Sequence, residues 1–266
     1  MDDLNAALSY RIVGEGPPLL LVHGWGLTFP LWQQLEAQLA GEARLIEVEL
    51  PGLGSSPPAS GDFVEAAVAG LRDLRVRLGI DRWTVLGYSA GARIVSRYVR
   101  EEPARVTGAV YLCPLLPLGP YPAFDAIRRA VGRVSGRPQL FFVTGWRLKW
   151  LMRVFAFNTV RPVPVDPWYR ALISQPLDVL LAQFEDLFDR EWAAIPPGVP
   201  AMRIWGCRDR LAVRPRPLGL QDRIIDAGHL APLNAAPAVA AVLRPFVRAL
   251  AAADSSWAAG APRCER

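Results

Sequence analysis

Five residues, Gly87-Tyr88-Ser89-Ala90-Gly91, place a serine between two glycines. The apolar residues 83–86 before them are typical of a short buried strand, whereas residues 90–100 carry apolar side chains at helical spacing. A serine at a sharp strand-to-helix turn exposes its hydroxyl, and glycines on either side allow the backbone segments to approach closely. The amino end of the helix favours a developing negative charge. The pattern therefore predicts that Ser89 is a nucleophile.

A serine hydroxyl attacks well only when a base accepts its proton and an acid orients that base. The sequence contains two histidines, His23 and His229. His229 follows an expected strand and turn near the carboxyl end, which is the position of the base in the chain order Ser, Asp, His. Asp209 lies just beyond the expected strand 201–206 and is predicted to be the orienting acid. A turn aspartate in a polar loop is the alternative interpretation of Asp209.

The elements that must position these residues alternate between strand and helix patterns. Such alternation predicts an α/β fold with a mostly parallel central sheet and helices on both faces. Asp62 is expected to cap the helix that follows it. The expected strands are residues 9–13, 19–22, 44–50, 83–86, 106–112, 201–206 and 223–226, and the expected helices are 31–39, 62–78, 90–100 and 238–249.

With these motifs the sequence resembles the α/β-hydrolase superfamily. The resemblance covers roughly residues 8–112 and 200–250, including His23-Gly24-Trp25-Gly26 and the loop Pro51-Gly52-Leu53-Gly54-Ser55. Within the superfamily, the His-Gly-Trp-Gly motif and the general layout are most similar to the pimeloyl-[acyl-carrier protein] methyl ester esterases of biotin synthesis. The resemblance implies the α/β-hydrolase fold with a helical lid inserted over the active site.

The resemblance also implies roles for further residues. Main-chain N–H groups of Trp25 and Ala90 would form an oxyanion hole, because such donors must point to where the tetrahedral oxygen develops. His23 would support this loop through its ring nitrogens rather than take part in catalysis. The residues expected to line the substrate site are Trp25, Tyr88, Phe141 and Trp146.

The sequence departs from the family pattern at three places. Glu49 stands where relatives usually carry Asp, and Ala92 replaces a frequent glycine after the serine turn. Only 20 positions separate Asp209 from His229, and two prolines between them argue against an intervening helix. Asp222 and Asp226 therefore remain competing candidates for the acid.

The alternation of strands and helices fails between Cys113 and Ile195, which predicts an insertion into one domain. We expect residues 1–113 and 196–250 to form the hydrolase core and residues 114–195 to form the lid. Residues 251–266 are small and polar and are expected to be a disordered tail.

The expected lid is strongly basic and aromatic. Between residues 121 and 170 it has nine basic and two acidic residues, a net charge of +7, while the rest of the chain sums to −2. Arg128, Arg129 and Arg133 form a basic patch that suits an acidic partner such as acyl-carrier protein. Solvated arginines and aromatic side chains packed on the core are the alternative. The aromatic residues are Phe141, Phe142, Trp146, Trp150, Phe155, Phe157 and Trp168.

Composition narrows the class of protein. The chain is 52% hydrophobic and 21% charged, which is typical of a folded domain with a large core. No recognised nucleic-acid-binding module accompanies its net charge of +5, and no apolar run of about 20 residues suggests a membrane span. The acidic start lacks a basic signal region, and the three cysteines are scattered without metal or redox spacing, so we expect a cytoplasmic protein. We expect a monomer that needs no metal or cofactor.

Together these features predict a serine-dependent carboxylic ester hydrolase, an enzyme acting on a small-molecule or acyl-chain ester. Hydrolysis of a lactone, amide or C–C bond remains an alternative, because one fold supports many reactions. A binding protein that keeps the fold without turnover is a further alternative.

Overall fold

The computed structural model describes residues 7–59, 61–115, 172–186, 198–212, 214 and 217–254. Its strands are β1 (Tyr10–Val13), β2 (Pro18–Val22), β3 (Arg44–Val48), β4 (Trp83–Tyr88), β5 (Val106–Leu112), β6 (Ala201–Gly206) and β7 (Asp222–Ile225). The strands predicted at 106–112 and 201–206 are observed with these bounds. The strand predicted at 44–50 ends at Val48. Beyond it the Glu49 N–H still donates to the Ser9 carbonyl, but the Leu50 N–H donates to the ring of His23 instead of a strand carbonyl.

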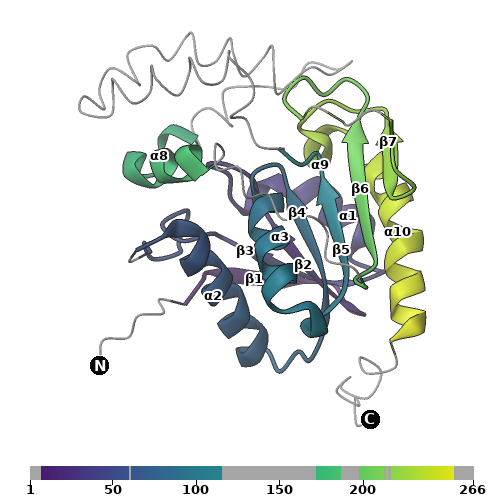
Figure 1. Ribbon diagram of the computed structural model, residues 1–266, viewed down its shortest axis with the longest axis horizontal. Coiled ribbons are helices and arrows are strands. Elements are labelled where there is room, and N and C mark those ends of the chain that lie inside the picture. The colour runs from purple at the N-terminus through teal and green to yellow at the C-terminus, as the bar shows by residue number, and fades with distance from the viewer. Residues whose placement is uncertain are drawn as a thin grey trace.

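These strands form one sheet in the order β1-β3-β2-β4-β5-β6-β7 (Figure 1). The pair β1 and β3 is antiparallel, and the other neighbouring pairs are parallel. The predicted α/β architecture with a mostly parallel sheet is therefore confirmed. In a sheet of this kind, ligands bind at the carboxyl ends of the parallel strands.

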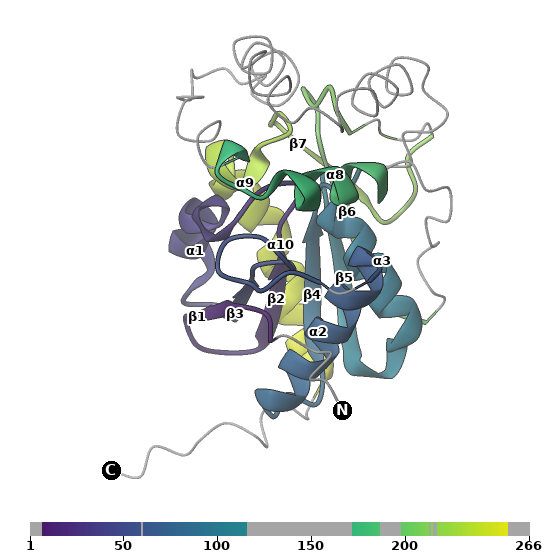
Figure 2. The same ribbon diagram turned by 90° about the vertical axis from the view of Figure 1, so that its left-hand side faces the viewer.

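Helices cover both faces of the sheet, as Figure 2 shows. On one face lie α1 (Gln33–Leu39), α9 (Ala231–Asn234) and α10 (Ala236–Ala253), and on the other lie α2 (Phe63–Arg77) and α3 (Gly91–Glu101). Helix α8 (Leu177–Asp186) lies at the carboxyl ends of the strands. Two 3-10 turns, η1 (Phe29–Leu31) and η2 (Pro103–Arg105), precede α1 and β5. Asp62 caps α2 as predicted, by accepting a hydrogen bond of 2.9 Å from the Glu65 N–H.

Strand β2 shows why the central strands have continuous apolar sequences. Leu19 and Leu21 pack toward α1 and α10, whereas Leu20 and Val22 pack toward α2 and α3. All four side chains are fully buried. A strand covered on both faces cannot alternate apolar with polar residues, so the run of leucines is the expected signature.

Helix α10 is longer than the predicted helix 238–249. Its 18 residues have the length and hydropathy of a membrane span, yet Val239, Leu243 and Val247 pack in the protein core. Arg244 and Arg248, on the same helix, form ion pairs with Glu42. Residues 251–253, expected in the tail, continue the helix, and residues 255–266 lie outside the described ranges.

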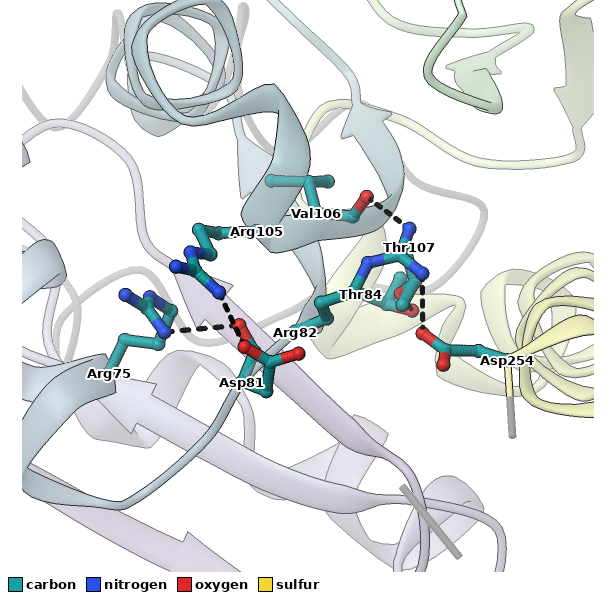
Figure 3. A network of polar contacts seen from close by, with 8 residues as sticks. All are labelled: Arg75, Asp81, Arg82, Thr84, Arg105, Val106, Thr107 and Asp254. Carbon is teal, nitrogen blue, oxygen red and sulfur yellow. Dashed lines mark hydrogen bonds and ion pairs between the residues drawn. The ribbon is translucent and has the colours of Figure 1, made fainter. Parts of the chain in front are cut away.

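A polar network fixes the amino ends of β4 and β5, at the opposite end of these strands from Ser89 (Figure 3). Arg82 pairs with Asp254 at 2.9 Å, beyond the end of α10, and donates to the carbonyl of Val106 at 3.2 Å. Arg105 forms an ion pair with Asp81. Exposed pairs of this kind contribute about 0–1 kcal/mol each to stability.

Candidate active site

Ser89 lies directly after β4, at the turn into α3. Its φ of 54° is in the left-handed region, which is unfavourable for a residue with a Cβ atom. A Cβ atom on Gly91 would lie 2.2 Å from the carbonyl oxygen of His23, and one on Gly87 would lie 2.6 Å from Cα of Ala92. Both glycines are therefore needed for α3 to begin tightly against β2 and β4. The strained turn predicted from the sequence is present.

A chain of two hydrogen bonds connects Ser89 with the predicted base and acid. Ser89 Oγ lies 2.8 Å from His229 Nε2, and His229 Nδ1 lies 2.8 Å from Asp209 Oδ2. Ser89 and His229 are 5% and 4% exposed, so both hydrogen bonds are largely shielded from solvent. Because an ionised carboxylate can only accept, Nδ1 carries the imidazole proton and Nε2 is free to accept the serine proton.

The second oxygen of Asp209 fixes the carboxylate in place. Oδ1 accepts hydrogen bonds from the N–H groups of Leu211 and Ala212, at 2.8 and 2.9 Å. The loop after β6 thus wraps around the carboxylate and leaves only Oδ2 for His229. This arrangement is that of an acid that orients a neighbouring imidazole.

The two competing acids point elsewhere. Asp226 has an exposed side chain and forms an ion pair with Arg208. Asp222 accepts from Arg203 at 2.7 Å and from the indole of Trp205 at 2.8 Å. Between β6 and β7 the described residues include no helix, so the short connection foreseen from the sequence leaves Asp209 as the carboxylate bonded to His229.

His23 holds the loop after β2 through both ring nitrogens. The N–H of Leu50 donates to Nε2 at 3.1 Å, and Nδ1 lies 2.9 Å from the carbonyl oxygen of Gly24, to which it can only donate. Full burial lowers the pKa of His23 to about 4, so the ring is neutral near pH 7. Leu27 N–H donates to the same Gly24 carbonyl at 3.3 Å. In a trans peptide the N–H points opposite to the carbonyl, so these bonds fix the direction of the Trp25 N–H.

This loop passes next to the nucleophile. A Cβ atom on Gly24 would lie 2.9 Å from Ser89 Cβ, so the backbone approaches Ser89 as closely as a glycine allows. Ala90 follows Ser89 at the amino end of α3, where its N–H donates to no acceptor within the described ranges. Gly24, which precedes Trp25, therefore lies against Ser89, and Ala90 follows the serine in the chain.

Helix α8 lies within the expected lid 114–195 and packs against the same loop, but these particular contacts were not predicted. The indole of Trp25 donates to the Leu180 carbonyl at 2.8 Å, and Gly26 N–H donates to Gln183 Oε1 at 3.1 Å. Gly26, with φ of 62°, has no room for a Cβ atom, because Leu172 and Leu180 lie over it. The one available sequence signal is that Gln183 follows Leu180 by three positions, which places a polar side chain on the buried face of a helix.

The other two departures from the family pattern, Glu49 and Ala92, lie in buried contacts. Glu49 Oε2 accepts the N–H of Ser55 at 2.7 Å, and its carboxylate would clash with any Cβ on Gly54. The Glu49 side chain therefore packs inside the loop after β3 and holds one of its N–H groups. Ala92 is fully buried against Gly87.

The predicted substrate-binding residues do not all lie where expected. The side chain of Tyr88 is fully buried and its hydroxyl donates to the carbonyl of His229 at 3.0 Å, so it offers no surface to a substrate. Trp25 is partly exposed beside α8. The remaining predicted residues, Phe141, Trp146, Arg128, Arg129 and Arg133, lie outside the described residues, as does most of the expected lid 114–195. No group of three or more His, Cys, Asp or Glu side chains in the described part is placed to hold a metal ion.

Known proteins with the alpha/beta hydrolase fold are similar to this chain in sequence and in structure. A family model described as the alpha/beta hydrolase fold matches residues 17–142. An esterase structure from Thermogutta terrifontis is 24% identical, superposes with a TM-score of 0.76, and the match covers 91% of this chain and 93% of that one.

The curated relatives match over shorter stretches. An uncharacterized protein of Mycobacterium tuberculosis is 27% identical over 76% of this chain, and the match spans 64% of that protein's length. A pimeloyl-[acyl-carrier protein] methyl ester esterase of Photobacterium profundum is 35% identical over 40% of this chain and 41% of its own.

Proposed function

Because the chain has the α/β-hydrolase fold, we propose that it hydrolyses carboxylic esters by nucleophilic catalysis at Ser89. The observation that carries this proposal is the hydrogen-bonded chain from Ser89 Oγ through His229 to Asp209, with both bonds at 2.8 Å. Its order and geometry are those of a nucleophile, a general base and an orienting acid. The esterase structure with which the fold superposes supports the choice of an ester as substrate.

The reaction would proceed through an acyl-enzyme. Ser89 Oγ attacks the ester carbonyl while His229 Nε2 accepts the serine proton. His229 then gives that proton to the leaving alcohol, and the acyl group remains on Ser89. A water molecule, deprotonated by His229, attacks the acyl group, and the proton on His229 then passes to Ser89 Oγ as the acid is released. Asp209 keeps the proton of His229 on Nδ1 and stabilises the imidazolium that forms in each half-reaction.

Two main-chain donors would stabilise the tetrahedral intermediate. The Trp25 N–H is directed by the bonds to the Gly24 carbonyl, and the Ala90 N–H lies at the amino end of α3. Donors fixed before the reaction need no reorganisation when negative charge develops on the substrate oxygen. The loss of one such donor typically costs a factor of about 100 to 1,000 in kcat.

Replacement of the nucleophile tests the proposal. Ser89→Ala should lower the rate of p-nitrophenyl ester hydrolysis by a factor on the order of 10⁴ or more while the fold is retained. A serine-directed organophosphonate should label the wild-type chain once, at Ser89. Wild-type protein without esterase activity or labelling would instead favour a binding protein, and cleavage of lactones or amides in preference to esters would change the substrate class.

We propose an acyl chain attached to an acidic carrier protein as a second, narrower candidate substrate, which two observations favour. Residues 121–170 carry a net charge of +7 with interleaved aromatic residues. Part of the chain also matches methyl ester esterases that are named for an acyl-carrier protein substrate. An acyl chain attached to an acidic carrier would combine an apolar contact with attraction between opposite charges.

Kinetics on matched esters would test this candidate. Acyl-carrier-protein esters should be cleaved with a higher kcat/KM than the free methyl ester of the same acid, and salt should reduce the difference. Replacement of Arg128, Arg129 and Arg133 with Glu should also reduce it, with little change toward a neutral short-chain ester. Equal efficiency on both substrates at all salt concentrations would leave a general carboxylesterase.

A further inference from the structure

The hydroxyl of Tyr88 joins the strand that carries the nucleophile to the loop that carries the imidazole. Tyr88 is the last residue of β4, immediately before Ser89. Its hydroxyl donates to the main-chain carbonyl of His229 at 3.0 Å, and the two rings are in contact, with centroids 5.4 Å apart and an interplanar angle of 40°. The residue before the nucleophile is thus hydrogen-bonded through its side chain to the main-chain carbonyl of His229.

His229 needs such a tie because it lies in a loop between β7 and α9. Strand pairing ends at Ile225, and within the described residues the His229 carbonyl accepts one other hydrogen bond, from Ala231 N–H at 2.8 Å. Ser89 and Asp209 hold the ring, whereas Tyr88 holds the main chain from which the ring extends. A small displacement of the reacting groups can lower a rate 100-fold, so a shift of this carbonyl would weaken the approach of Nε2 to Oγ.

The surroundings of Tyr88 keep its hydroxyl in one place and protonated. Trp32 packs edge-on against the ring, with centroids 6.2 Å apart at 77°. Burial, with smaller contributions from Cys113 and Asp209, raises the pKa of Tyr88 well above its ordinary value. The hydroxyl therefore remains a hydrogen-bond donor throughout the working pH range of a histidine base.

We propose that Tyr88 is a positioning residue, which sets the main chain of His229 relative to Ser89 and so maintains the hydrogen bond between Oγ and Nε2. The inference rests on the proposed esterase function and replaces the predicted contact of Tyr88 with substrate. It implies that the hydroxyl of Tyr88 acts on kcat through His229 and has no direct effect on substrate binding.

Tyr88→Phe removes this hydroxyl and retains the ring, and Tyr111→Phe provides a matched control. Tyr111 is a buried tyrosine on the neighbouring strand β5, but it faces α3 on the opposite side of the sheet. Tyr88→Phe should lower kcat for p-nitrophenyl esters by about 10-fold, with KM within twofold of wild type. The rate of labelling by the organophosphonate should fall by the same factor, while Tyr111→Phe should keep both rates.

Three kinetic results would overturn the proposal. Unchanged kcat and labelling in Tyr88→Phe would do so, and so would a raised KM with unchanged kcat, which would return Tyr88 to substrate binding. In a Ser89→Ala background Tyr88→Phe should cause no further loss of residual hydrolysis, because it acts through the Ser89–His229 pair; an additive loss would contradict this. Tyr88→Met, which also fills the space and lacks a donor, replaces Tyr88→Phe if that variant does not fold.

A measurement without turnover separates this inference from the proposed function. The low-field proton resonance of His229 Nδ1–H should shift or broaden in Tyr88→Phe and stay unchanged in Tyr111→Phe. An unchanged resonance in Tyr88→Phe would overturn the positioning role even if the wild-type chain proved not to be an esterase. A changed resonance in a chain without esterase activity would support it and reject the proposed substrate.

Discussion

The N–H of Leu50 donates to Nε2 of His23 over 3.1 Å, so the second residue beyond β3 holds the side chain that shapes the loop after β2. A ring that accepts at Nε2 and donates at Nδ1 is satisfied only in its neutral form. Protonation would place a second donor against the Leu50 N–H in a fully buried site. This conflict, together with the burial that lowers the pKa to about 4, links His23 to the pH dependence of stability.

Stability should therefore fall on acidification through His23. The unfolded chain takes up the proton near pH 6.5 and the folded chain only near pH 4, so the contribution is complete above pH 6.5 and is lost as the pH falls toward 4. Between pH 7 and pH 5 this linkage should reduce the free energy of unfolding by about 2 kcal/mol. Urea denaturation of wild type and His23→Gln at both pH values measures it, and an equal pH dependence in the two proteins would refute it.

The comparison with His23→Gln is needed because Glu47 changes the free energy of unfolding with pH in the direction opposite to His23. Burial, against the favourable contact with Arg11, raises the pKa of Glu47 to about 8. The folded chain thus holds this proton above the unfolded pKa, and the contribution of Glu47 is lost as the pH rises toward 8. It cancels in the difference between the two proteins.

Asp209→Asn should lower kcat by a factor on the order of 10⁴ with little loss of stability. Leu211 and Ala212 N–H groups both donate to Oδ1, so the asparagine carbonyl would remain there and its NH₂ group would face His229. Nδ1 would then accept, and Nε2 would carry the proton and could not accept one from Ser89. Steady-state kinetics with Asp226→Asn as the control test this. A variant that retains a tenth of wild-type turnover would exclude Asp209 as the orienting acid.

The fold was more predictable than the contacts inside the site. The strands could be inferred because buried strands have apolar runs, although β4 continues through Gly87 to Tyr88, two residues beyond its predicted end. The order Ser89, Asp209, His229 was readable for the same reason, since each residue follows a predicted strand. The bond from Tyr88 to His229 was not, because it joins residues 141 positions apart and depends on which face of the sheet each side chain occupies.

Replacement of Ser89 by glycine should separate strain from activity. At φ of 54° a Cβ atom is unfavourable, and glycine removes it. Ser89→Gly should therefore exceed Ser89→Ala in stability by up to about 1 kcal/mol, after allowance for the greater freedom of glycine in the unfolded chain. Both variants lose the bond to His229 and should be inactive, so their difference in urea denaturation reports the strain alone. A glycine variant less stable than the alanine variant would show that the turn is relaxed.

Gln183 offers a test of whether α8 supports the oxyanion loop. Gln183→Met has a similar volume but no acceptor, so the Gly26 N–H would lose its partner in a buried site. An unsatisfied buried donor costs about 1–3 kcal/mol, and the loop should shift to relieve it. We expect kcat for a short-chain ester to fall by about 10-fold with KM nearly constant, because the displaced loop carries the Trp25 N–H.

The matched control for this experiment is Gln175→Met. Gln175 lies in the same segment and also accepts a glycine N–H, that of Gly54 at 3.0 Å, but this bond is exposed and belongs to the loop after β3. Gln175→Met should leave kcat within twofold of wild type. An equal fall in kcat in both variants would mean that the bond from Gly26 to Gln183 has no specific role in the oxyanion loop. An unchanged kcat in Gln183→Met would mean that this bond is not needed to hold the loop beside His23.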